Sequence, residues 1–305
     1  MHVRARCHQQ QAAALLQLKN RTFSFGPASC DIPTTTLPSW KAGTDCCHWE
    51  GISCDRVAGT VTALNLSNKC IQISGFHPAL FSLVSLKYLD LGGNQFSGSH
   101  LPDSGFDMLT QLQVLNLRQS NLSGTIPPSL SGLHSLKVID LSGNYLTGGL
   151  APHLFSNLSL LEILDLSENS FQHGAIPLGI THLRNLKVLN LEDTNLIGVI
   201  PNSIGNLSSL TELHLGLNSF IGGLPWSLNN LTHLTVLNCP YSGLSGRIPS
   251  FASLTRLEEV SLSDNKLTGT LKGTCTRHEM ALLGSYPDKG QLKVHGSGLK
   301  PQHRR

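Results

Sequence analysis

A cluster of thiols and one imidazole lies near the N-terminus of the chain. The stretch TDCCHWEGISCD, residues 44–55, places Cys46, Cys47, His48 and Cys54 within nine residues. Thiolates and imidazoles are ligands of zinc, but a structural zinc site usually has two ligand pairs at C-x₂₋₄-C spacing. Cys46 and Cys47 are adjacent, and no second pair follows at a suitable distance. A C-x-x-C redox motif is also absent from the sequence. The spacing therefore argues against a metal site and against redox catalysis.

No other group of residues has a spacing typical of catalysis. The sequence contains no H-E-x-x-H, no phosphate-binding loop, no dinucleotide fingerprint and no kinase motif. Glu168, Glu192 and Asp193 could form a carboxylate pair, but an open surface would not separate the pKa values of two such groups. We therefore expect a protein that is not an enzyme and that needs no cofactor and no metal.

Composition limits the partners and the compartment. The 305 residues include only 13% charged residues, and the net charge of +3 is too small to favour nucleic acid or a membrane surface. No run of eighteen apolar residues occurs, so we expect no membrane span in this chain. The N-terminus also lacks a secretory segment of the usual length. Eight cysteines are nevertheless unusual for a reducing compartment.

An internal repeat determines the expected fold. The pattern L-x-x-L-x-L recurs nine times at intervals of 23 to 26 residues, with these first positions: Val61, Leu86, Leu112, Leu136, Leu161, Leu186, Leu210, Leu234 and Leu257. One repeat cannot bury its own leucines, whereas stacked repeats share a continuous core. The pattern predicts an α/β solenoid, a curved horseshoe whose concave face is a parallel β-sheet.

A single repeat explains this prediction. In LKVIDLSGNYLTG, residues 136–148, Ile139 and Leu141 alternate with Asp140, which is the period of a short strand with one buried face. Asn144 follows where the chain turns, and a buried amide there can satisfy backbone groups of neighbouring turns. The same position holds Asn94, Asn144, Asn169, Asn218 and Asn265, with Ser120, Thr194 and Ser242 in three other repeats and Lys69 in the first.

A Leu-Pro or Ile-Pro pair recurs at nearly the same position of six repeats, as in Ile200-Pro201. Together with the preceding N-x-[LF]-x-G, this pattern resembles the plant-specific class of leucine-rich repeat. Residues 13–19 (AALLQLK), 37–40 (LPSW) and 44–55 look like the N-terminal cap of plant extracellular leucine-rich-repeat proteins. The insertion GSHLPDSGFDMLTQL, residues 98–112, is further similar to receptor-like proteins of the wilt-resistance type.

The resemblance implies a domain division and a set of disulfides. We expect a cap at 1–57, nine repeats at 58–271 and a non-repeat, disordered tail at 272–305. In the cap family the first of the paired cysteines bonds to one near the chain start and the second bonds forward, which implies Cys7–Cys46 and Cys47–Cys54. Cys239 occupies an inward position, so we expect a buried free thiol. Cys30, Cys70 and Cys275 stay unassigned, although Cys30 and Cys70 could pair.

Six N-x-[ST] sequons occur, and three of them share one position on the back of the repeat. An extracellular location makes glycosylation plausible, whereas Asn65 lies on an expected strand and is a poor candidate. We predict N-glycans on Asn20, Asn121, Asn157, Asn206 and Asn230.

Outward residues of successive strands should form columns on the concave face. One column contains Asn and Asp in most repeats and runs from Asn65 to Ser261; it could serve hydrogen bonding between adjacent turns or ligand contact. Variable residues beside it are the candidate ligand-binding set: Tyr88, Arg118, Glu168, Glu192, Asp193, Glu212, His214, Leu217, Tyr241, Glu259 and Asp264.

The leading hypothesis is part of the ectodomain of a plant receptor-like protein that binds a protein, peptide or glycan ligand in defence or development. The resemblance implies an extracellular or plasma-membrane location and a partner co-receptor kinase. The short repeat run and the missing leader predict an incomplete member of the family. The alternative is a secreted inhibitor similar to polygalacturonase-inhibiting proteins, and a third possibility is a soluble adaptor. A repeat count near ten favours the inhibitor, and the insertion at 98–112 counts against it.

Overall fold

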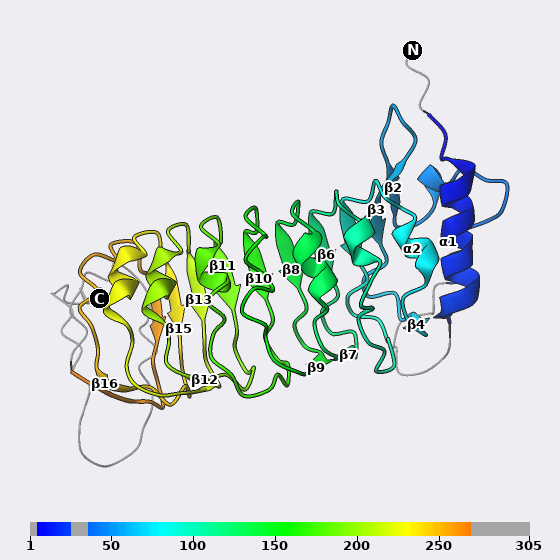
Figure 1. The fold of residues 1–305 in the computed structure, drawn as a ribbon. Helices are drawn as coiled ribbons and strands as arrows, with labels where there is room; N and C mark the ends of the chain where they lie inside the picture. The colour runs from blue at the N-terminus through cyan, green and yellow to red at the C-terminus, as the bar shows by residue number, and fades with distance from the viewer. Residues whose placement is uncertain (1–4, 26–35, 270–305) are drawn as a thin grey trace, which may run out of the picture.

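The chain forms a solenoid of stacked turns closed at its N-terminal end by a helix. The computed structural model describes residues 5–25 and 36–269. Figure 1 shows the successive turns side by side along one axis, with helix α1 (Gln9–Thr22) against the first of them. The repeat prediction is confirmed, because each of the nine first positions begins one turn.

One ten-stranded sheet runs the length of the described solenoid. Its strands follow sequence order, and only the pairing of β2 with β3 is antiparallel. The strands are β2 (Ile52–Cys54), β3 (Val61–Asn65), β5 (Tyr88–Asp90), β6 (Val114–Asn116), β8 (Val138–Asp140), β10 (Ile163–Asp165), β11 (Val188–Asn190), β13 (Glu212–His214), β15 (Val236–Asn238) and β17 (Glu259–Ser261).

The register of this sheet keeps equivalent residues of all repeats in line. In β8, Ile139 is buried while Val138 and Asp140 are half-buried. Asp140 pairs with Asn116 on one side and with Asp165 on the other. Since a strand alternates its side chains between two faces, this register sends every central apolar residue into the core and aligns the outward residues in columns.

Short elements complete each turn. Four two-stranded sheets are formed by β1 (Phe23–Ser24) with β4 (Gln72–Ile73), β7 (Ser123–Gly124) with β9 (Tyr145–Leu146), β12 (Ile197–Gly198) with β14 (Ser219–Phe220), and β16 (Ser245–Arg247) with β18 (Lys266–Thr268). The remaining helices are α2 (Pro78–Phe81) and the 3₁₀ helices η1 (Cys46–His48), η2 (Phe106–Met108), η3 (Pro128–Gly132), η4 (Ile180–His182), η5 (Asn202–Asn206) and η6 (Trp226–Asn230). In η3, η5 and η6 the Pro of the Leu-Pro or Ile-Pro motif is the residue that precedes the helix.

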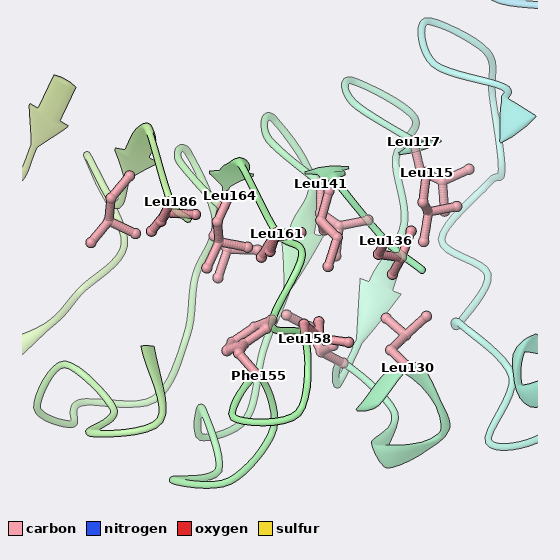
Figure 2. Packing of buried hydrophobic residues seen from close by; sticks show 14 of the residues in the cluster. Leu115, Leu117, Leu130, Leu136, Leu141, Phe155, Leu158, Leu161, Leu164 and Leu186 are labelled. Atoms are coloured by element: carbon pink, nitrogen blue, oxygen red, sulfur yellow. The ribbon is translucent and has the colours of Figure 1, made fainter. Parts of the chain in front are cut away.

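The core lies between the sheet and the 3₁₀ turns. Figure 2 shows Leu130, Phe155 and Leu158 of the turns facing the leucines of the strands, among them Leu115 and Leu164. All five side chains are buried. Each repeat thus contributes apolar residues from both of its sides to one continuous core, which no single repeat could form.

The buried amides form the expected ladder between turns. Asn144 donates from Nδ2 to the carbonyls of Leu117 in the preceding turn and Leu141 in its own, both at 2.9 Å. Its Oδ1 accepts from the backbone N–H of Leu122 at 3.0 Å. Thr194 substitutes as predicted, because its hydroxyl donates to the carbonyl of Leu191 at 2.7 Å. The ladder therefore satisfies backbone groups that the turns leave without strand partners.

The cap covers the apolar end of the first turn. Helix α1 buries Ala14, Leu15 and Leu18 against the core. Trp40 and Trp49 are buried and stacked, with ring centroids 5.5 Å apart. These two indoles therefore help to close the end of the core.

Both predicted disulfides are present in the cap. Cys7–Cys46 and Cys47–Cys54 each have a Cα–Cα distance of 5.4 Å, and the four sulfurs lie within 4.8 Å of one another. The backbone N–H of Cys7 donates to Asp45 Oδ1 at 2.9 Å, and this bond lowers the pKa of the Asp45 carboxyl. The thiol cluster of the sequence is thus a pair of neighbouring cross-links.

Two of the remaining cysteines lie within the described residues. Cys239 is a buried free thiol, as predicted, and burial raises its pKa to about 12. Cys70 is disulfide-bonded. Cys30, Cys275 and the predicted tail 272–305 lie outside the described residues. Among the described residues, the helices are all too short or too polar to cross a bilayer.

Candidate functional site

The outward surface of the ten-stranded sheet carries the candidate binding residues. We call it the strand face, and we number positions from the first residue of each repeat. Side chains at the third, fifth, seventh and eighth positions of each repeat lie on this face, and the register of β3 to β17 aligns them from turn to turn.

The fifth-position column has a local structural role. Asp165 Oδ1 accepts from the backbone N–H of Ser167 at 3.0 Å and from its hydroxyl at 2.6 Å. Asn116 Oδ1 likewise accepts from the N–H of Arg118 at 3.1 Å. A bond between adjacent turns occurs where Asn190 Nδ2 donates to Asp165 Oδ2 at 3.1 Å. Hydrogen bonding between adjacent turns, one of the two roles considered for this column, thus occurs, but most of these side chains accept from the backbone N–H two residues further along their own repeat.

Asp140 in this column gives a pH-dependent prediction. Burial raises the pKa of its carboxyl, and the nearby charge of Asp165 adds to the increase. The folded chain therefore holds this proton more tightly than the unfolded chain, so Asp140 lowers stability as pH rises through its folded pKa. We expect Asp140→Asn to raise the free energy of unfolding by a few tenths of a kcal/mol at pH 7.

The fold accepts this change, because Asn116 and Asn190 occupy the same column. Urea unfolding at pH 7 and at pH 3.5 measures the effect. The gain should disappear at the lower pH, where Asp140 is itself neutral, and an equal gain at both pH values would contradict the electrostatic explanation.

The eighth-position column has an unusual backbone that the sequence analysis did not predict. All nine of its residues have positive φ, and seven are not glycine. They are Asn68, Gly93, Gln119, Gly143, Glu168, Asp193, Leu217, Tyr241 and Asp264. The N–H of each of Glu168, Asp193, Leu217 and Tyr241 donates to the carbonyl of the seventh residue of the next repeat at 2.9 to 3.0 Å. Glycine and Asn at this position in other repeats were the sequence signal for a left-handed turn.

Two residues of this column expose large apolar side chains. Leu217 is 48% exposed and Tyr241 is 58% exposed, and they occupy neighbouring turns. The left-handed conformation costs an L-residue with a Cβ about 1–2 kcal/mol, and these exposed side chains recover little of it by burial. The interaction with the Asp264 carboxylate raises the pKa of the Tyr241 phenol.

The remaining candidates divide between the two ends of the face. Tyr88 donates to Asp90 Oδ2 at 3.0 Å and is half-buried, so its hydroxyl already has a partner inside the chain. His214 Nε2 lies 3.4 Å from Glu212 Oε2. Arg118 and Glu259 are exposed near opposite ends of the sheet. The structure therefore groups nine of the eleven predicted residues in the last five repeats and leaves Tyr88 and Arg118 apart.

The predicted glycosylation sites lie in two environments. Asn157, Asn206 and Asn230 are exposed on the 3₁₀ side of their turns, and Asn20 is exposed on α1. Asn121 is half-buried, and its Nδ2 donates to Gln95 Oε1 at 2.8 Å. The first four positions leave the strand face unobstructed.

Family models match both the cap and the repeats. The model of the leucine rich repeat N-terminal domain matches residues 8–55, and a leucine rich repeat model matches residues 97–146. A second repeat model matches 85–106, 135–158 and 185–207. The chain is thus built of leucine-rich repeats that follow a leucine-rich-repeat N-terminal domain. The predicted fold class and the predicted plant-type cap are confirmed.

The curated relatives of this leucine-rich-repeat chain are plant receptor-like proteins. Receptor-like protein 6 of Arabidopsis thaliana is 37% identical over 150 residues, which cover 46% of this chain and 15% of the relative. Receptor-like protein 50 of the same plant is 41% identical over 143 residues, covering 45% and 16%. Receptor-like protein Cf-9 of Solanum pimpinellifolium is 31% identical over 214 residues, covering 49% and 24%. The chain thus matches less than a quarter of the length of these three relatives.

Solved leucine-rich-repeat structures share the same architecture. The Arabidopsis receptor kinase HAESA, in complex with the peptide hormone IDA and the co-receptor SERK1, has a TM-score of 0.69 and 29% identity, covering 86% of this chain and 47% of that one. The structure of PEPR1-AtPEP1 has a TM-score of 0.68 and 29% identity, covering 87% and 43%.

Proposed function

We propose that this leucine-rich-repeat chain is an extracellular recognition module of a plant receptor-like protein, and that its strand face binds a protein or peptide ligand. The observation that carries the proposal is the pair Leu217 and Tyr241. Both side chains are exposed, apolar and held on a left-handed backbone by the stacked turns. Side chains that cost stability and stay exposed on a rigid scaffold are typical of contact residues.

Two further observations support an extracellular binding role. Two adjacent disulfides in the cap are typical of oxidising compartments. The exposed sequons at Asn157, Asn206 and Asn230 lie away from the strand face, so N-glycans there would not obstruct a ligand. We propose glycosylation at these sites and at Asn20 and Asn121, and signalling through a partner receptor kinase, by analogy with the co-receptor that the HAESA complex contains. Defence and development stay equal alternatives for the process served.

A glycan shield tests the binding face. Val236→Asn with Asn238→Thr creates an N-L-T sequon on β15, the fourth of the last five strands, and removes no carboxylate. We expect peptides selected on the secreted protein from a random twelve-residue display library to bind the shielded variant at least tenfold more weakly, because the glycan covers the strand face. Binding is measured by fluorescence anisotropy, and mass spectrometry verifies that the sequon is occupied.

The matched control places a glycan on the back of a turn. Gly132→Asn with His134→Ser creates an N-L-S sequon at the same position of the repeat as Asn157, and a Cβ at Gly132 meets no atom within 4 Å. This variant should bind the selected peptides within twofold of the wild type. Loss of binding in the control with retention in the β15 variant would place the ligand on the other surface and overturn the proposal.

A further inference from the structure

Negative charge is concentrated on the last five repeats of the strand face. At the third, fifth, seventh and eighth positions these repeats carry seven carboxylates and no Lys or Arg, a formal charge of −7. We call this surface the acidic face: Asp165, Glu168, Glu192, Asp193, Glu212, Glu259 and Asp264. The same positions in the first four repeats carry only Asp90, Asp140 and Arg118, a formal charge of −1. Since the whole chain has a net charge of +3, the acidity is local.

These carboxylates lack cationic partners within the described chain. The Lys–Glu pair nearest to them joins Lys187 to Glu162 at 2.6 Å, and both of these residues are at the second position, outside the acidic face. Of the seven, only Glu212 has a basic neighbour, His214 at 3.4 Å. Adjacent strands are about 4.8 Å apart, which is less than the Debye length of about 8 Å at physiological ionic strength. The carboxylates therefore repel one another, and a cationic ligand would relieve that repulsion.

The arrangement suits an extended cation better than a metal ion. Among the described residues, the group that brings at least three potential ligand atoms together is the cysteine cluster of the cap. The carboxylates of the acidic face are instead spread across five turns, from β10 to β17. A row of charges at strand spacing matches a chain of separate positive groups, such as the Lys and Arg side chains of a peptide.

An apolar platform interrupts the acidic face in its middle. It consists of Gly216, Leu217, Pro240 and Tyr241, the seventh and eighth positions of two neighbouring repeats. Gly216 is required there, because a Cβ at this position would lie 2.8 Å from Pro240 Cδ. The backbone at Gly216 thus lies in close contact with Pro240. Exposed aromatic and aliphatic groups bounded by polar residues are typical of the centre of a binding surface.

Carboxylates bound this platform along the solenoid axis. Glu192 and Asp193 precede Leu217 by one turn, and Asp264 follows Tyr241 by one turn. The Asp264 carboxylate raises the pKa of the Tyr241 phenol, as expected of a neighbouring negative charge. The three turns from Asp193 to Asp264 span about 14 Å, the length of about four residues of extended peptide.

We propose that the acidic face binds an extended peptide segment that carries Lys or Arg on both sides of an apolar residue, with the apolar side chain on Leu217 and Tyr241. The basic residues lie two or three positions from the apolar one and pair with Glu192 and Asp193 at one end and Asp264 at the other. This inference rests on the proposed function, and it names the chemical class of its ligand.

The test uses the same random twelve-residue display library, selected on the full secreted chain. Enriched sequences should contain Lys or Arg on both sides of an apolar residue. The Kd of a synthetic enriched peptide should rise at least tenfold in the variant Glu192→Gln, Asp193→Asn, Asp264→Asn, and should rise with salt in the wild type. Leu217→Ala with Tyr241→Ala should weaken binding while the salt dependence stays unchanged.

The control removes three carboxylates elsewhere. Asp55→Asn, Asp103→Asn and Asp107→Asn make the same change in net charge at exposed positions outside the acidic face, and the Kd should stay within twofold. Two outcomes overturn this inference and leave the proposed function standing. In the first, the glycan on β15 blocks the enriched peptides, but these peptides lack basic residues. In the second, the glycan blocks them, but they bind the acidic-face variant with an unchanged Kd. Peptides that the β15 glycan does not block overturn both, and a library without any enriched sequence overturns the inference.

Discussion

Replacing Asn144 with alanine should lower the free energy of unfolding by about 4 kcal/mol, because a buried polar group without a partner costs about 1–3 kcal/mol and several are created at once. The side chain donates to the carbonyls of Leu117 and Leu141 and accepts from the N–H groups of Ser120 and Leu122. Alanine removes every one of these bonds and has no polar atom to replace them. Urea unfolding followed by circular dichroism measures the loss.

Two variants separate the ladder effect from a general effect of losing an amide. Asn144→Ser should cost about half as much, since Ser120 and Ser242 show that the position accepts a hydroxyl that donates to the preceding turn. Asn202→Ala removes an exposed amide on η5 and should change stability by less than about 0.5 kcal/mol. If Asn144→Ala and Asn202→Ala lower the free energy of unfolding equally, the hydrogen bonds of the ladder do not contribute the stability that is assigned to them.

Removing the cross-link Cys7–Cys46 by substituting both residues with alanine should lower the free energy of unfolding by about 4 kcal/mol, the chain-entropy value for a loop of this length. The bond links residues that are 39 positions apart, and it joins the segment just before α1 to η1. Without it, the segment before α1 is held by the hydrogen bond from Cys7 N–H to Asp45, while α1 keeps its apolar contacts and bonds such as Val61 N–H to Gln11 Oε1 and Lys19 Nζ to the Leu37 carbonyl. Hydrogen exchange at Leu15 and Leu18 should therefore accelerate together with the loss of stability.

The second cross-link is the natural comparison. Cys47–Cys54 closes a separation of only 7 residues, so replacing both cysteines with alanine should cost about 2.5 kcal/mol. Exchange at Leu15 and Leu18 should change little, because this bond does not hold α1. Faster exchange of α1 in the second variant than in the first would contradict the assignment of Cys7–Cys46 as the bond that anchors the helix.

Much of the fold could be predicted, because the residue pattern of one repeat indicates the local structure that the repeat adopts. The alternation of Ile139, Asp140 and Leu141 specifies the strand, and the recurrence of Asn144 specifies the turn that follows. The cap disulfides came from the family resemblance, since the spacing of Cys46, Cys47 and Cys54 alone excludes other chemistry but selects no partner. The structure confirmed both pairings.

The binding surface was predicted less completely, for physical reasons. The outward columns follow from strand alternation, but the backbone state of Leu217 and Tyr241 depends on the turn that each repeat makes after its strand. In the sequence, only the glycine or Asn at the same position of other repeats indicated this left-handed backbone. The close contact between Gly216 and Pro240 depends on the register of two neighbouring turns, which the sequence of one repeat does not contain.

The left-handed column also limits how this surface can evolve. Its nine residues include glycine, amides, carboxylates, leucine and tyrosine, but no Val, Ile or Thr, because branching at Cβ makes a positive φ far more costly. Substitution among unbranched residues can therefore change the charge and size of each side chain while the turn is kept. A mutagenesis library that excludes β-branched residues and proline at these positions would vary recognition along the whole face without disturbing the scaffold, one side chain for every turn of the solenoid.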